Sequence, residues 1–323
     1  MNFFAGVDGG GTKTEIAALD AQGNTLCRIR GESTNPHAVG RQKAFTELTS
    51  LFGLLWKHPN LYDLKCSGIS LGMSGIDGEK ERADLTAHLK QELRKQGADC
   101  PFEIRTEGEI ALTAALGKPE GLQVIAGTGS IVYGFAPGRR KARAGGWGHL
   151  LGDEGGGYRI GLAALRLSAL AFDAEDAGAG VGSEAGGGAT PLADAVRAAL
   201  GLDTPEALKR WVYAPGTGKA AIAALAETVL RACESGDPDA RGIVEDEAAK
   251  LAATTAELLR RRPEFACGAA VLGGSIFGHS PSFRGAFARI LSAEFPKLTF
   301  VDGAAGRSPA EGAALLALRT FGG

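Results

Sequence analysis

The feature that most constrains this fold is a short unit that occurs twice: an apolar strand, a turn of glycine and hydroxyl residues, and a second strand. The first copy lies in GVDGGGTKTEIAAL, residues 6–19. The second surrounds IAGTGS, residues 125–130. A supersecondary unit repeated near positions 8 and 128 predicts a duplicated fold with a cleft between its halves.

Strand and helix patterns alternate after each of the two turns. The pattern restarts at residue 122, so we expect an α/β protein with an N-terminal domain over residues 1–118 and a C-terminal domain over residues 119–323. After Tyr158 the sequence becomes mainly helical, with one continuous helix expected over Ala220–Glu234 and a last helix over Pro309–Leu318. The glycine-rich stretch 178–188 is predicted to be a surface loop.

Composition excludes several classes of protein. Of the 323 residues 44% are apolar and 22% are charged, as in an ordinary globular protein, and the net charge of −2 argues against nucleic acid or an anionic membrane as the main partner. The five cysteines form no C-x-x-C pair, which favours reduced thiols over a disulfide frame, a zinc site or an iron–sulfur site. No signal sequence and no apolar run of about 18 residues is found, so a cytoplasmic protein is expected.

The first turn has the composition of a phosphate-binding site. Glycines 9–11 carry no Cβ atom, so their backbone N–H groups can face one anion, and the hydroxyls of Thr12 and Thr14 add donors. Neither the P-loop pattern nor the dinucleotide fingerprint is present, since a strand rather than a helix follows. Asp8 would repel a phosphate unless Mg²⁺ lies between them. The alternative is a glycine hairpin that binds no ligand.

The second turn repeats this chemistry. Gly127, Thr128, Gly129 and Ser130 again combine glycines with hydroxyl groups. One such turn is weak evidence because glycine and serine are common in turns. Two of them predict a pair of hairpins that hold the phosphates of one nucleotide.

Several motifs in a fixed order then resemble a known family. GVDGGGTKTE, STNPH (33–37), SGID (74–77), AGTGS, GGWGHLLGDEGGGYRIG (145–161), VLGGS (271–275) and the final SPAEGAALLAL follow one another along the chain. The sequence resembles the N-acetylglucosamine kinase branch of the actin-like ATPase superfamily, within the BadF/BadG/BcrA/BcrD ATPase group. The resemblance implies two actin-like (ribonuclease H-like) ATPase domains with an interdomain cleft where ATP and sugar meet. It also suggests a homodimer.

The resemblance assigns roles to individual residues. Asp8 matches the carboxylate that acts through Mg²⁺, with water between them. Nucleotide contacts fall on Gly9, Gly10, Gly11, Thr12, Lys13, Gly127, Thr128, Gly129, Ala223, Gly274 and Ser275. Sugar contacts fall on Asn35, Ser74, Gly75, Ser130, Gly146, Trp147, Gly148 and Asp153.

The residue types at the sugar positions suit that role, although simpler explanations exist. The Asn35 amide can both donate to and accept from a hydroxyl, and Pro36 predicts an extended backbone before it. The alternative for Asn35 is a turn residue. The face of Trp147 can pack on the C–H side of a sugar ring; the alternative is core packing, which its glycine-rich surroundings disfavour. Glu154 is expected either to cap the following helix or to reach the sugar.

One position departs from the family. Where the resemblance expects an aspartate as general base, this chain reads RTEGEIAL and places Glu107. The favoured function is ATP-dependent phosphorylation of the 6-hydroxyl of N-acetylglucosamine, with glucosamine and N-acetylmuramic acid as alternative acceptors. A sugar-binding homologue with weak catalysis is the second hypothesis, because of Glu107. An ATPase that activates a dehydratase is disfavoured, because such proteins carry cluster-binding cysteines; the cysteine spacing also excludes the zinc-binding branch of sugar kinases.

Overall fold

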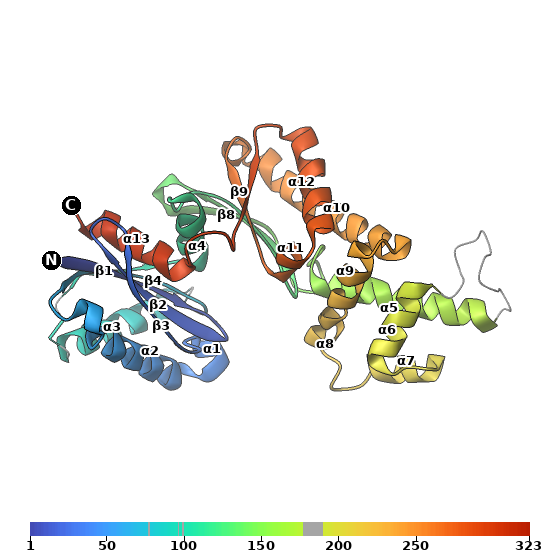
Figure 1. The fold of residues 1–323 in the computed structure, drawn as a ribbon, viewed down its shortest axis with the longest axis horizontal. Helices are drawn as coiled ribbons and strands as arrows, with labels where there is room; N and C mark the ends of the chain where they lie inside the picture. Colours follow the sequence, from blue (N-terminus) through green and yellow to red (C-terminus); the bar gives the residue numbers. More distant parts are fainter. Residues whose placement is uncertain (77, 96, 99, 177–189) are drawn as a thin grey trace. The chain divides into compact units, whose positions relative to one another are not determined.

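Five strands form the first mixed sheet, in the order β3-β2-β1-β4-β5 (Figure 1). In this computed structural model β1 pairs antiparallel with β2 and parallel with β4, and β2 and β3 are antiparallel. The strands are β1 (Asn2–Gly9), β2 (Lys13–Asp20), β3 (Thr25–Glu32), β4 (Lys65–Met73) and β5 (Phe102–Arg105). The structure describes residues 1–323 apart from 77, 96, 99 and 177–189, so the predicted loop at 178–188 lies outside the described residues.

Helices cover both faces of this sheet. Phe3, Ala5 and Val7 of β1 join one core with the apolar faces of α2 (Arg41–Trp56) and α3 (Glu79–Lys95). Side chains alternate along a strand, so Asp8 faces the other side. That side is covered by α4 (Glu107–Leu116) and α13 (Pro309–Phe321), whose residues Ile110, Ala313 and Leu316 pack together. The alternation of β1 therefore directs the Asp8 carboxylate toward the face that α4 covers.

The C-terminal helix α13 belongs with this first sheet. A Cβ atom at Gly6 would lie only 2.1 Å from the backbone of α13, so helix and strand touch directly. Glu311 of α13 is buried, accepts from Thr25 and pairs with Arg28 of β3 at 2.7 Å. Contacts divide the chain into one unit of residues 1–121, 135–140 and 303–323 and another of residues 122–134 and 141–302. The expected boundary at residue 118 therefore differs at the C-terminus, because the small residues of α13 fit the first sheet.

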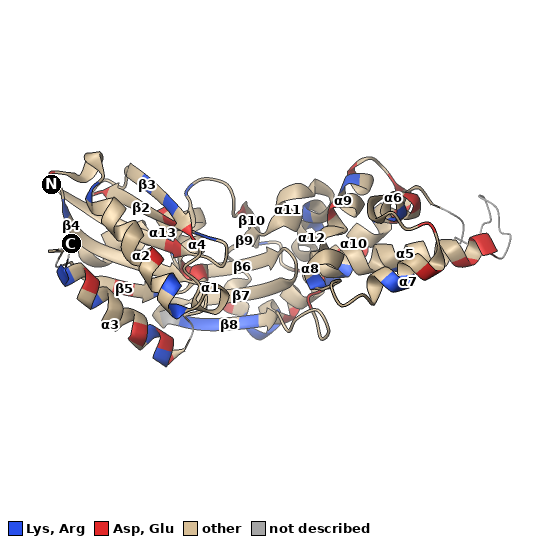
Figure 2. Ribbon diagram, turned by 90° about the horizontal axis from the view of Figure 1, so that it is seen from below, with Lys and Arg blue, Asp and Glu red and all other residues tan. Residues whose placement is uncertain are grey.

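The second sheet repeats the first. Its order β8-β7-β6-β9-β10 is the order of the first sheet with five added to each number, and β9 is parallel to both β6 and β10. The predicted duplication of the α/β unit is confirmed. Edge strand β8 is strongly basic (Figure 2), and charged edge strands resist pairing with other chains. The strands are β6 (Gly121–Ala126), β7 (Ser130–Ala136), β8 (Arg140–Gly145), β9 (Ala269–Gly273) and β10 (Thr299–Asp302).

Helices make up most of the second unit. The expected single helix over Ala220–Glu234 is two helices, which meet at Leu225. Helix α12 was not predicted, although Ser280 caps it through the N–H of Phe283, a readable signal before a proline. The helices are α5 (Gly157–Asp176), α6 (Pro191–Leu200), α7 (Pro205–Val212), α8 (Lys219–Ala224), α9 (Ala226–Glu234), α10 (Pro238–Arg261), α11 (Ser275–His279) and α12 (Pro281–Glu294); the first unit adds the short α1 (Pro36–Val39).

Among the described residues, no helix combines the length and the apolar character needed to cross a membrane. The five cysteines are all free thiols, and four of them are buried.

Candidate active site

The first glycine turn is held by its carbonyl groups. Residues 10–12 connect β1 to β2. The carbonyl of Gly9 accepts from the N–H of Ser74 at 2.8 Å, and the carbonyl of Gly10 accepts from the Ser33 hydroxyl at 3.0 Å. With the carbonyls tied to the protein, Gly11, Thr12 and Lys13 are exposed. The N–H of Gly10 closes the turn by donating to the carbonyl of Lys13 at 2.9 Å, so this group is not offered to a phosphate.

The structure changes the expected role of Thr14. Its hydroxyl is buried and lies 2.9 Å from the hydroxyl of Thr34, so it anchors the strand rather than offering a donor to a ligand. Thr34 also explains why residue 9 is glycine: a Cβ atom there would lie 2.5 Å from Thr34 Oγ1. None of the three turn glycines adopts a positive φ, so close approach explains this glycine rather than left-handed backbone.

Two carboxylates, Glu15 and Glu107, lie near Asp8. Glu15 is its register partner on β2, and like charges opposite each other on one face repel. Burial, followed by the nearby charges of Glu107 and Glu15, raises the pKa of Asp8 to about 6, while Lys13 acts in the opposite direction. Glu15 also pairs with Arg30 at 2.9 Å, yet its Oε1 is buried without a hydrogen-bond partner. The cluster therefore carries excess negative charge next to the turn.

Glu107 lies beside this cluster at the first position of α4. Thr106 caps the helix, so the Glu107 side chain starts where the helix dipole favours a negative charge. Its Oε1 accepts from the Ser74 hydroxyl at 2.5 Å. The structure thus brings together the predicted base, the predicted sugar contact Ser74 and the predicted metal carboxylate Asp8.

The Glu109 carboxylate is engaged in contacts that hold the fold. It accepts from the N–H of Thr106 at 2.9 Å in a capping box, and it pairs with Arg105 at 3.2 Å. The side chain is buried. The capping box was readable from TEGE in the sequence and explains why this carboxylate points away from Glu107.

We therefore expect Glu109→Ala to destabilise the fold rather than the chemistry. Loss of the box and of a buried ion-pair partner should lower the free energy of unfolding by about 1–3 kcal/mol. Urea denaturation measures this change. A variant as stable as the wild type would show that the box contributes nothing.

Asn35 is fixed as the N-cap of α1. Its Oδ1 accepts from the N–H of His37 at 2.8 Å, and its backbone is extended as expected before Pro36. The side-chain oxygen of Asn35 therefore has the local structural role that the turn alternative predicts, while its amide Nδ2 lies close to Gly11. Gly75 has φ +76°, and a Cβ atom there would lie 2.5 Å from Asn35 Oδ1. In the first unit, Asn35 and Gly75 thus adjoin each other next to the phosphate turn.

The second glycine turn lies in the second unit, where it meets the start of α5. The carbonyls of Gly127 and Thr128 accept from the N–H groups of Gly157 at 2.7 Å and Tyr158 at 3.1 Å. A cavity of about 260 Å³ opens beside the turn between α8, α9 and α11. Four of the predicted nucleotide residues line it together: Gly127, Thr128, Ala223 and Ser275.

Gly274 lies between β9 and α11 and positions Ser275 in the lining of this cavity. It precedes α11 with φ +94°, and a Cβ atom there would lie 2.2 Å from the carbonyl of Ala126. Only glycine allows the chain to pass so close to the end of β6 and deliver Ser275 to the cavity wall.

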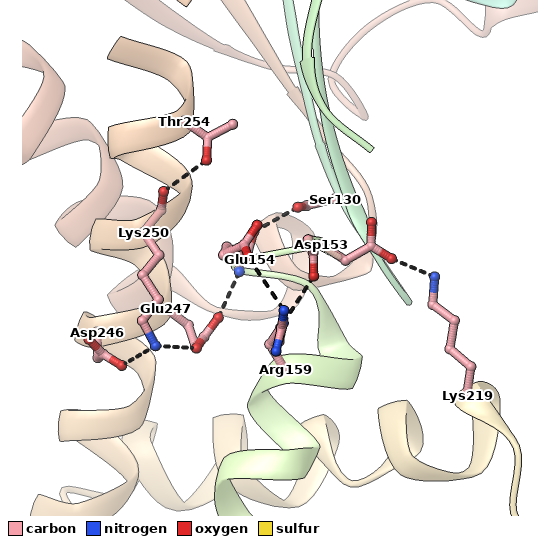
Figure 3. A network of polar contacts seen from close by, with 11 residues as sticks. Ser130, Asp153, Glu154, Arg159, Lys219, Asp246, Glu247, Lys250 and Thr254 are labelled. Carbon is pink, nitrogen blue, oxygen red and sulfur yellow. Dashed lines mark hydrogen bonds and ion pairs between the residues drawn. The ribbon is translucent and has the colours of Figure 1, made fainter. Parts of the chain in front are cut away.

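Asp153 lies against the second turn and is almost fully buried, at 4% exposure. Its Oδ2 pairs with Lys219 Nζ, the first residue of α8, at 2.6 Å (Figure 3). A Cβ atom at Gly129 would lie 2.3 Å from this carboxylate. The resemblance matches residues 219–223 to a nucleotide-side segment although the sequence offers little motif there, and the pairing of Lys219 with Asp153 is seen only in the structure.

Neighbours of Asp153 have roles that the sequence left open. The Ser130 hydroxyl donates its hydrogen to the carbonyl of Glu154 at 2.6 Å. Toward a ligand, the Ser130 oxygen could therefore act only as a hydrogen-bond acceptor. Glu154 does not cap α5; its carboxylate lies 3.5 Å from the guanidinium of Arg159. The ring of His149 packs against Tyr158, which fits the structural role expected of it.

Trp147 is 64% exposed, which excludes the core-packing alternative. The guanidinium of Arg143 lies 4.2 Å from the ring centroid and covers one face. Gly146 and Gly148 on either side both have positive φ, as the backbone of this segment requires.

Comparisons with known proteins identify the relatives of this chain. It is 31% identical over 253 residues, 78% of this chain and 77% of the relative, to an N-acetylmuramic acid/N-acetylglucosamine kinase of Clostridium acetobutylicum. It is 33% identical over 222 residues, 66% of this chain and 65% of the relative, to an N-acetyl-D-glucosamine kinase of Dictyostelium discoideum.

Solved structures extend the likeness to the fold. A Chromobacterium violaceum protein provisionally described as an N-acetylglucosamine kinase matches with a TM-score of 0.67 and 26% identity, over 98% of this chain and 99% of that one. A hexokinase of Thermus thermophilus from the ROK group matches in fold alone, with a TM-score of 0.55 and 19% identity over 98% of this chain and 99% of that one. The model of one family matches residues 5–317. This chain belongs to the BadF/BadG/BcrA/BcrD ATPase family.

Proposed function

We propose that this protein transfers the γ-phosphoryl group of ATP to the 6-hydroxyl of an amino sugar, with N-acetylglucosamine as the favoured acceptor. The observation that carries the proposal is the cluster of Asp8, Glu107 and Ser74 beside the first glycine turn. Phosphoryl transfer needs a phosphate cradle, charge neutralisation and a base for the attacking hydroxyl. This cluster offers a group for each of these needs.

Glu107 is proposed as the base. Its carboxylate accepts a hydrogen bond from the Ser74 hydroxyl at 2.5 Å, the contact that a general base would make with a substrate hydroxyl. Lys219, which is paired with Asp153 beside the second turn, supplies a positive charge next to a predicted phosphate contact.

Mg²⁺ fits the first cluster. Asp8 lies among like charges that raise its pKa to about 6, and Glu15 Oε1 is buried without a partner, so a cation would relieve both. Among the described residues no three His, Cys, Asp or Glu side chains gather as a complete metal site. This agrees with an ion held by Asp8, water and the phosphates of ATP, since Mg²⁺ commonly takes one or two protein carboxylates. Bound there, the ion would neutralise phosphate charge.

The acceptor is proposed from the two relatives, whose names include N-acetylglucosamine. Asn35 and Asp153 offer the polar groups that sugar hydroxyls need, and Trp147 offers an apolar ring face. N-Acetylmuramic acid is the second candidate, because the Clostridium acetobutylicum relative is named for both sugars.

A turnover assay tests the proposal. Release of ADP is followed with N-acetylglucosamine, N-acetylmuramic acid, glucosamine, glucose and no acceptor, with and without Mg²⁺, and phosphorus NMR locates the transferred group. Sugar-dependent ADP release with a 6-phosphate product is expected. ADP release that ignores every sugar would favour an ATPase, and sugar binding without turnover would favour the weakly catalytic homologue.

Trp147→Ala is expected to raise the KM for the sugar roughly tenfold while changing the KM for ATP little. The reason is the loss of apolar contact with one substrate, typically about 1–3 kcal/mol. Leu150→Ala is the matched control, because Leu150 is 79% exposed on the same segment. Similar rises in both KM values would indicate a folding defect and contradict the assignment.

A further inference from the structure

The segment that carries Asp153 is anchored from several directions (Figure 3). Arg159 Nε donates to the carbonyl of Gly152 at 2.9 Å, and the Ser130 hydroxyl donates to the carbonyl of Glu154. The N–H of Gly155 donates to Glu247 Oε2 at 2.8 Å. The Arg159 and Ser130 anchors lie 7 and 24 residues along the chain from the groups that they hold, whereas Glu247 comes from α10, 92 residues from Gly155.

Asp153 needs such anchors because of its backbone. Its φ is +64°, and among the described residues no other non-glycine residue has a positive φ. A left-handed residue with a side chain is strained and persists only where its surroundings hold it. Gly155 follows with φ +78°, and a Cβ atom there would lie 2.7 Å from Leu251 Cβ, so α10 packs directly against this turn.

Glu247 is a buried carboxylate with both oxygens engaged in hydrogen bonds. Its side chain is 4% exposed, although carboxylates are rarely buried. One oxygen accepts from the Gly155 N–H and the other from Lys250 Nζ at 2.8 Å, while Lys250 also pairs with Asp246 at 2.6 Å. A charged acceptor makes a stronger bond to a backbone N–H than a neutral one.

We propose that Glu247 is a positioning residue that holds Asp153 in its left-handed conformation through Gly155, and so orients the Asp153 carboxylate for the sugar. Glu247 itself touches no substrate. The inference rests on the proposed function in using Asp153 as a sugar contact. The nucleotide side keeps its own bonds, because the first N–H groups of α5 donate to the carbonyls of Gly127 and Thr128. Release of the Glu247 anchor should therefore disturb the sugar side first.

The test compares Glu247→Ala with Glu247→Gln. The alanine variant loses the acceptor and is expected to raise the KM for N-acetylglucosamine about tenfold or more, with the KM for ATP within about threefold of the wild type. The glutamine variant keeps an oxygen for the Gly155 N–H and leaves Lys250 paired with Asp246, so it should rescue the sugar KM to within about threefold of the wild type.

Two controls separate positioning from folding. Asp246→Ala removes the neighbouring exposed carboxylate and should change neither KM. Leu259→Ala, at the far end of α10 and buried, should lower stability and leave the sugar KM unchanged. A normal sugar KM in Glu247→Ala, or an equal rise in both KM values, would overturn the inference.

Calorimetric sugar binding keeps this test separate from the proposed function. A wild type that turns over no amino sugar would refute the kinase proposal. If that wild type still binds the sugar, loss of binding in Glu247→Ala and its return in Glu247→Gln would support positioning. Unchanged binding in Glu247→Ala would refute positioning whatever the turnover.

Discussion

Glu107→Ala is expected to lower kcat by about 10²–10⁴-fold while sugar binding is retained. A positioned base contributes rate enhancement of that order. Glu107 starts α4, accepts from Ser74 at 2.5 Å, and lies close enough to Asp8 to raise its pKa. The measurement is steady-state turnover at saturating sugar and ATP, together with calorimetric sugar binding.

Two further variants sharpen this result. Glu107→Asp should keep measurable activity, because aspartate has nearly the same reference pKa and is shorter by one methylene, with Gly108 next to it to let the backbone adjust. Glu109→Ala should keep most of kcat once assayed well below its lowered melting temperature, because Glu109 is engaged in the capping box. Normal turnover in Glu107→Ala would show that the base lies elsewhere.

Asp8→Ala is expected to cut turnover by about 100-fold or more and to weaken binding of magnesium–ATP. Stabilisation of charge at the transferring group is often the largest single contribution to catalysis, and loss of one such group costs about 10²–10³-fold. Calorimetry with ATP, with and without Mg²⁺, should show that the variant has lost most of the magnesium-dependent gain in affinity. Normal magnesium–ATP binding with normal turnover in this variant would exclude Asp8 from the site.

The same carboxylate should make the ligand-free fold less stable at neutral pH. The pKa of Asp8 is raised from 3.8 to about 6, so the native state binds more protons than the unfolded state between these values. Stability from this group is therefore lost as pH rises through about 6, by up to about 3 kcal/mol, since one pKa unit corresponds to about 1.4 kcal/mol.

Asp8→Asn, with no carboxylate to ionise, should consequently unfold at a higher urea concentration than the wild type at pH 7.5 when EDTA is present. The difference should shrink as pH falls toward 4. Urea titrations of both proteins at several pH values measure it. A difference that stays constant with pH would contradict the electrostatic cost assigned to Asp8.

Much of this protein could be predicted from local pattern. The two strand–turn–strand copies correctly indicated a duplicated α/β fold, because alternating apolar residues and glycine turns determine strands and hairpins locally. The first copy also marked the Asp8 region, where the residues lie within a few positions of each other. The family resemblance was confirmed by the match over residues 5–317.

Other features needed distant parts of the chain. Residues 303–323 join the first unit because the small residues of α13 fit against Gly6, a contact across some 300 residues that no periodicity reports. The pairing of Asp153 with Lys219 likewise joins a turn to the first residue of α8, 66 residues away, with no shared motif. Burial and close approach decide such pairs, and both depend on the finished tertiary structure.

The sequence by itself thus determined the two sheets, their glycine turns and the residue types suited to phosphate and sugar. Only the tertiary structure decided which partners each carboxylate has. Glu107 and Glu109 are two residues apart, yet one reaches Ser74 and the other closes a helix cap. Glu247 looks like any helical glutamate until α10 packs against Gly155 and buries it. The physical reason is that a carboxylate's role depends on its partners and its exposure to water, which are set by packing between segments far apart in the chain.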